Sequence, residues 1–137
     1  MSATIEPDLQ FSVLCDDVRI ENNGKFILVG LFEAIRARTF PVQHPVLFVI
    51  NRWCNGEGQF REKTRLVSAI NEPVMEGPEN TFLLKATTGV YTVVSRFTGI
   101  PFQHAGTYWV EVLLDDRLKQ RYPLTLVKIE PKAKPSP

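Results

Sequence analysis

Two pairs of neighbouring aspartates are the residues of this chain whose type and spacing most invite a chemical role. Asp16 and Asp17 interrupt the apolar stretch FSVLCDDVRI, and Asp115 and Asp116 end the stretch WVEVLLDD. Hard cations such as Ca²⁺ are held by several carboxylate oxygens at once. No D-x-D spacing is present, however, and the first pair stands several residues before the next turn signal. We therefore predict that the chain binds no metal, with calcium as the alternative.

The apolar pattern around the first pair predicts a structural role instead. Apolar side chains occupy odd positions from 9 to 15, whereas Val18 and Ile20 continue the pattern on even positions. A strand cannot change its buried face without an extra residue. A β-bulge at Asp16 and Asp17 would supply that residue, because an aspartate side chain can accept a hydrogen bond from a nearby N–H.

Two histidines and two cysteines complete the set of candidate reactive groups: His44, His104, Cys15 and Cys54. Nucleophilic catalysis needs a Ser or Cys beside a His that is oriented by an acid. Both histidines stand in segments that we predict to be loops, and the four residues lack the paired spacing of zinc ligands. We expect no catalytic residue, no cofactor and no enzymatic activity. A glycosidase-like carboxylate pair is the hydrolase alternative, but the sequence does not identify the pair.

Length and charge narrow the class of protein. The 137 residues suit one domain, and 16 Lys and Arg against 15 Asp and Glu leave a net charge of +1. Nucleic-acid-binding domains normally carry a basic excess, so we predict no nucleic-acid partner. No signal peptide is visible, and no apolar run reaches the roughly 18 residues of a membrane helix. We therefore expect a cytoplasmic protein with no membrane partner and with reduced cysteines.

Short segments of period-two hydrophobicity, separated by turn signals, predict an all-β chain. Asn23-Gly24 is a strong hairpin signal, since both residues tolerate positive φ. Similar turns are predicted at the sequence NGEG, which would pair the third and fourth strands, and at Asp115-Asp116. The predicted strands cover residues 9–20, 25–33, 46–54, 59–70, 81–87, 90–97, 107–115 and 118–129.

About eight strands of this kind predict an immunoglobulin-like (or C2-like or fibronectin-like) antiparallel β-sandwich. Tyr108, two residues after Gly106 at the start of a late strand, matches the tyrosine corner of such folds, and Trp53 matches their core tryptophan. The sandwich is expected to span residues 9–129. Residues 1–8 would form an N-terminal arm, and the Pro- and Lys-containing residues 130–137 a disordered tail.

Several motifs along the chain resemble those of a family of small bacterial single-domain β-sandwich proteins that has no assigned function. They are LCDDVR, NGK and LVGLF in the first half, and GIPF and GTYWVEVLLDD in the second. The resemblance extends from Leu14 to Val127. It implies a β-sandwich, and it supplies no catalytic residue.

One strand carries the candidate binding residues. If Tyr108 and Val110 face the core, alternation turns Trp109, Glu111 and Leu113 outward. An outward Trp and Leu on one strand indicate a surface that a partner covers, although an ordinary sheet face roofed by the 36–45 loop is an equal alternative.

The predicted function follows from this face. Arg52 would extend it, if the 46–54 strand lies beside the 107–115 strand as in an immunoglobulin-like order. We predict a binding or assembly module that associates with protein, a second copy of the chain being one such partner. Carbohydrate binding is the alternative, with Trp53, Trp109 or Phe102 stacking on a sugar ring.

Overall fold

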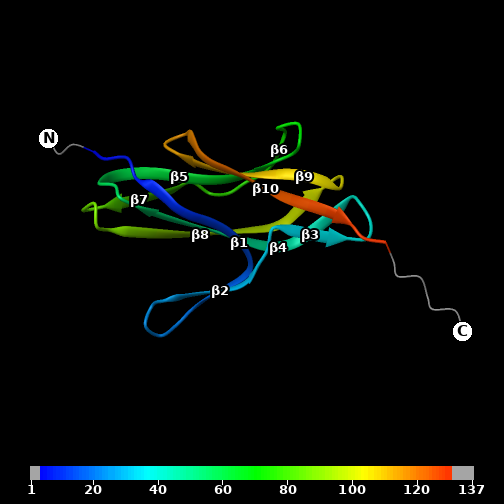
Figure 1. The fold of residues 1–137 in the computed structure, drawn as a ribbon, viewed down its shortest axis with the longest axis horizontal. Coiled ribbons are helices and arrows are strands. Elements are labelled where there is room, and N and C mark those ends of the chain that lie inside the picture. Colours follow the sequence, from blue (N-terminus) through cyan, green and yellow to red (C-terminus); the bar gives the residue numbers. More distant parts are fainter. Residues whose placement is uncertain (1–3, 131–137) are drawn as a thin grey trace, which may run out of the picture.

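The computed structural model describes residues 4–130, which form ten β-strands in two sheets (Figure 1). The first sheet has the order β2-β1-β4-β8. The second has the order β3-β10-β9-β5-β6, and β7 also pairs with β5. The strands are β1 (Asp8–Ile20), β2 (Phe26–Leu31), β3 (Ala34–Ala37), β4 (Val42–Cys54), β5 (Gly58–Val67), β6 (Pro73–Glu76), β7 (Asn80–Leu84), β8 (Val90–Phe102), β9 (Gly106–Leu114) and β10 (Arg117–Lys128).

The all-β prediction is confirmed, but the strand count and one pairing are not. Strands β3 and β6 form where loops were expected, and β3 pairs with β10 in parallel. The predicted hairpin around NGEG is wrong, because β4 and β5 belong to different sheets. The connecting segment passes from one sheet to the other, and its Glu57 bridges to Ile5 instead. The hairpins β1–β2 and β9–β10 form as predicted, with Asp115 and Asp116 at φ 46° and 65° in the second turn.

The predicted bulge at Asp16 and Asp17 is also wrong. Strand β1 keeps one register with β2 on both sides of Asp16, since Cys15 pairs with Leu31 and Asp17 with Val29. The register shift lies earlier, between Leu9 and Phe11, where β1 pairs with β4. The extra residue there moves the core-facing positions from odd to even, so that Leu14 is buried in the core.

The two sheets pack face to face over two apolar clusters. The first contains Leu14, Ile35, Leu47, Val49, Leu66, Phe97, Ile100, Phe102, Tyr108, Val110, Leu124 and Leu126. The second contains Trp53, Phe60, Phe82, Leu84, Val93, Val112 and Leu114. Residues from both sheets contribute to each cluster. Among residues 4–130 there is no helix of the length and apolar character that a membrane span requires.

Buried polar side chains separate the two clusters. Asn51 lies on β4 between a residue of each cluster, and Glu62 and Thr64 occupy the equivalent stretch of β5. The Asn51 amide nitrogen lies 3.0 Å from Glu62 Oε2 and 2.7 Å from Thr64 Oγ1, and Asn80 Nδ2 donates to Glu62 Oε1 at 2.7 Å. Burial raises the pKa of the Glu62 carboxyl above its ordinary value, although these hydrogen bonds oppose the shift.

The structure describes the predicted tyrosine corner and part of the predicted N-terminal arm. Tyr108 is buried, and its hydroxyl donates to the His104 carbonyl at 2.9 Å, as a corner residue should. In the predicted N-terminal arm, Glu6 accepts a hydrogen bond from Arg117 at 2.7 Å, which ties residue 6 to β10. The predicted tail, from residue 131 onward, lies outside the described residues.

Candidate functional site

The outer face of β9 is the surface that the sequence singled out. Trp109, Glu111 and Leu113 do point away from the core, as alternation predicted, because Tyr108, Val110 and Val112 fill it. In the second sheet, β9 lies between β5 and β10. Side chains from those two strands therefore decide how much of this row reaches solvent.

Side chains of the neighbouring strands cover most of the row formed by Trp109, Glu111 and Leu113. Arg65 on β5 and Arg121 on β10 lie opposite Glu111, with Nε–O distances of 2.7 and 3.3 Å. The Arg121 guanidinium also stacks on the Trp109 ring, 4.1 Å from its centroid. Leu113 keeps only 7% of its surface exposed. The expectation of a bare indole and leucine side by side in water is therefore wrong. The face is covered, as the alternative expected, but by Arg65 and Arg121 and not by the 36–45 loop.

Arg52 lies on the other sheet and does not extend this face. Strand β4 pairs with β1 and β8, so the expectation that it flanks the 107–115 strand is wrong. Arg52 points outward from β4, where its Nε donates to Thr92 Oγ1 at 3.1 Å and its guanidinium stands 5.9 Å from the Phe11 ring centroid. The structure thus brings Trp109, Glu111 and Leu113 together and places Arg52 elsewhere.

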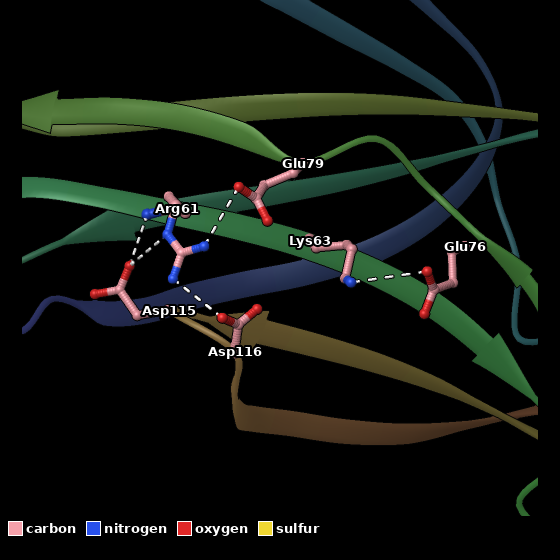
Figure 2. A network of polar contacts seen from close by, with 6 residues as sticks. All are labelled: Arg61, Lys63, Glu76, Glu79, Asp115 and Asp116. Carbon is pink, nitrogen blue, oxygen red and sulfur yellow. Dashed lines mark hydrogen bonds and ion pairs between the residues drawn. The ribbon is translucent and has the colours of Figure 1, made fainter.

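The two aspartate pairs do not come together. Arg61 binds the second pair, with its Nη2 3.0 Å from Asp116 Oδ2 and its backbone N–H donating to Asp115 Oδ1 at 2.9 Å (Figure 2). Glu79 completes the arrangement at 3.5 Å from Arg61. The arginine neutralises the carboxylates that a cation would otherwise use. In the described part of the chain, no three His, Cys, Asp or Glu side chains are grouped as metal ligands.

The histidines and cysteines belong to no such group within residues 4–130 either. His44 lies within strand β4, not in a loop as expected, and burial lowers the pKa of its imidazole. His104 lies in the β8–β9 turn, where its backbone bonds Tyr108. Burial raises the pKa of the Cys15 thiol, which disfavours the reactive thiolate.

The β1–β2 hairpin carries an apolar surface that the sequence interpretation missed. Its exposed large apolar side chains are Ile20, Phe26, Ile27, Val29 and Leu31. Figure 1 shows the distal part of this hairpin leaving the two packed layers. The signal was visible in the sequence KFILVGLF: an uninterrupted apolar run is typical of a strand buried on both faces, not of an edge strand with one wet face.

One face of the hairpin overlooks a groove on the first sheet. Register pairs Val18 with Leu28 and Ile20 with Phe26, so these four apolar side chains share a face. Phe26 and Leu28 line a groove of about 440 Å³, whose opposite wall includes residues of β1, β4 and β8. These wall residues are Phe11, Ile50, Arg52 and Thr92. The opposite face of the hairpin presents Ile27 and Val29 beside the exposed ion pair Asp17–Arg19.

The aromatic residues expected to stack on a sugar are differently placed. Trp53 and Phe102 are fully buried between the sheets, so neither offers a ring face to a ligand. Trp109 is partly buried beneath Arg121. The exposed aromatic ring nearest the groove is that of Phe26, on the hairpin.

Fold and surface define a class of protein: an all-β domain of two packed sheets whose edge strand β2 is apolar and exposed. Residues 10–127 match the model of a family of unknown function, DUF6941, and the chain belongs to this family. A search of curated proteins finds no match to the chain.

Proposed function

We propose that the protein is a non-catalytic binding or assembly module that associates with protein through its β1–β2 hairpin. The observation that carries the proposal is the exposure of apolar side chains on both faces of β2. Burying one such side chain completely is worth roughly 1.5–3 kcal/mol. A partner that covered several of them would bury more exposed apolar surface than any other strand of residues 4–130 offers, since no other strand carries more than three such side chains (Val90, Tyr91 and Val94 on β8).

The backbone of β2 supports the same proposal. Strand β2 is the edge of its sheet, so one side of its backbone has no partner strand. Edge strands of soluble proteins are usually protected by charged side chains, prolines or bulges. The six residues of β2 contain no charge and no proline, although Gly30 departs from extended backbone at φ 73°. The extended segment before it, Phe26–Val29, suits strand addition, in which backbone hydrogen bonds and apolar contacts act together.

Two further parts of the proposal concern fold and chemistry. We assign the two-sheet fold to the immunoglobulin-like kind, on the support of the Tyr108 corner bond. The absence of catalysis is supported by burial, which disfavours both the charged imidazole of His44 and the reactive thiolate of Cys15. A screen with generic ester, phosphate and glycoside substrates tests the second part. Turnover that disappears in His44→Ala or His104→Ala would contradict it.

Affinity capture with tagged variants tests the association itself. We expect wild type to recover one protein in near-stoichiometric amount from a host extract, whether a second copy or another chain. The double variant Ile27→Glu/Val29→Glu should lose it. The control Leu83→Glu alters a side chain of similar exposure, 52%, on β7 of the other sheet, and should retain it. The proposal fails if no protein depends on the hairpin, or if both variants behave alike.

A further inference from the structure

The groove between the β1–β2 hairpin and the first sheet has an apolar end and a cationic end. Register across β1, β4 and β8 aligns one outward row of Val13, Ile50 and Val94, and a next row of Phe11, Arg52 and Thr92. In Figure 1 the hairpin turns back, so that its tip points to the side from which β1 begins. Lys25, beside the tip, and Arg52 therefore line the same end of the groove, whereas Leu28 and Ile50 line the other.

The two cations of the groove have no carboxylate partner in the described part of the chain. Arg52 is nevertheless held in place, since its Nε donates to Thr92 Oγ1 at 3.1 Å and its guanidinium stands 5.9 Å from the Phe11 ring centroid. Neither Arg52 nor Lys25 forms an ion pair there, whereas Arg61 on the second sheet contacts three carboxylates. No described Asp or Glu lines the groove. Its charge therefore complements an occupant that carries a carboxylate, which a guanidinium binds by charge-assisted hydrogen bonds.

The free edge of β2 determines how such an occupant can lie. The Glu21 N–H donates to the Lys25 carbonyl at 2.8 Å, so this pair of the hairpin turns its backbone groups inward. In an antiparallel pair, inward and outward residues alternate, so Phe26 and Leu28 turn their backbone groups to the free edge. The extended edge ends at Gly30, where φ is 73°. It therefore offers backbone hydrogen bonds to a short extended segment only.

On the basis of the proposed function, we propose that the partner supplies an extended segment of another protein, with alternating apolar side chains next to an Asp or Glu. The segment pairs with the free edge of β2, and each of its residues shares a face with the β2 residue opposite. The side chains opposite Phe26 and Leu28 therefore point into the groove. At the cationic end, the carboxylate of the segment binds Arg52 and Lys25. Side chains of its other face cover the opposite, exposed face of the hairpin.

Peptide selection tests the segment and its carboxylate. Wild type selects binders from a random library of peptides of about ten residues, the upper length of a usual strand, and calorimetry measures their affinity. We expect the selected peptides to share an Asp or Glu next to alternating apolar residues. Arg52→Gln and Lys25→Gln should each weaken binding about tenfold. The matched control Arg96→Gln should not, because Arg96 is exposed on the same outer face but does not line the groove.

Several outcomes would overturn the inference. They are a library that yields no binder, selected peptides without a shared acidic residue, and equal affinities of the control and the two groove variants. Tighter binding of decanoate than of any selected peptide would identify the occupant as a free fatty acid and not a protein segment. Circular dichroism shows whether each variant is folded, and Lys25, exposed beside the hairpin tip, provides a test that does not depend on the packing of Arg52.

The proposed function has its own test, so the two can fail separately. A protein that is captured through the hairpin, and whose capture is unchanged by Arg52→Gln and Lys25→Gln, would leave the proposed function standing and end this inference. A second copy of the chain as the captured protein would do the same. Loss of the captured protein in both groove variants, with retention in Arg96→Gln, would support the inference.

Discussion

The β1–β2 hairpin and the outer face of β9 each carry a row of apolar side chains, but the two rows differ in their exposure to solvent. On β9, Trp109 lies under a guanidinium and Leu113 is almost completely buried. On β2, Ile27 and Val29 are each 40% exposed, and Leu31 is 62% exposed. Strand β9 has a neighbour on each side, whereas β2 has one.

The difference shows that facing outward is not the same as being exposed. Arginine can lay its apolar stem and planar head across a sheet while its charge finds a carboxylate. Arg65 and Arg121 do this from the two strands that flank Glu111. On the hairpin, the one nearby ion pair, Asp17–Arg19, joins residues of the same strand and leaves the edge of β2 bare. We therefore propose that association uses the hairpin and not the Trp109 face.

Removing the Glu111 carboxylate that joins Arg65 and Arg121 should have the largest effect on stability. Glu111→Ala leaves Arg65 and Arg121 without their shared, mostly buried partner, and we expect the free energy of unfolding to fall by about 2 kcal/mol. Urea denaturation measures this loss. Glu111→Gln should recover part of it by hydrogen bonding. An unchanged urea midpoint for Glu111→Ala would show that the ion pairs of Glu111 do not contribute to the free energy of unfolding.

Tyr108→Phe should have a smaller effect, because it removes one buried hydrogen bond and keeps the ring against Phe102. We expect a loss of about 1 kcal/mol, measured by urea denaturation. Tyr91→Phe, which changes a partly exposed tyrosine on β8, is the matched control. Equal midpoints for the two variants would remove the role assigned to the corner bond.

The buried carboxyl between the apolar clusters predicts a pH dependence. The pKa of Glu62 is raised in the folded state above its ordinary 4.5, so the folded protein holds this proton more tightly than the unfolded chain does. The stabilisation that the protonated Glu62 carboxyl gives the fold is therefore fully present below pH 4.5, and it is lost as the pH rises through the raised pKa. Glu62→Gln cannot ionise. As the pH rises through this range, the melting temperature of the variant should therefore increase relative to that of wild type. A constant difference between pH 4 and pH 8 would contradict this.

Variants of the hairpin should have the smallest effect on stability. Ile27→Glu replaces a side chain that is already 40% exposed, so we expect a change within about 0.5 kcal/mol, measured by urea denaturation of the dissociated protein. Its association should nevertheless weaken at least tenfold. A loss of stability as large as that of Glu111→Ala would mean that the hairpin is part of the fold and not a docking element.

Much of the local structure could be predicted from the sequence because it depends on neighbouring residues. Asn23-Gly24 and Asp115-Asp116 set two hairpins through their backbone preferences, and alternation assigned the outward face of β9. The position of Arg52 could not be predicted in this way, since the sheet that β4 joins is decided by packing between distant strands. The burial of Leu113 and Glu111 depends likewise on side chains from β5 and β10, which no local pattern reveals.

Residue-resolved hydrogen exchange compares the two regions in one measurement. The amides of Phe26 and Leu28 turn toward the free edge of β2, so we expect them to exchange rapidly in dilute protein and to become protected as association proceeds. Amides of β9 around Trp109, paired within the sheet at all concentrations, should not change. Association that protects surfaces around Trp109, or that leaves Phe26 and Leu28 unprotected, would contradict the assignment of the hairpin as the docking surface.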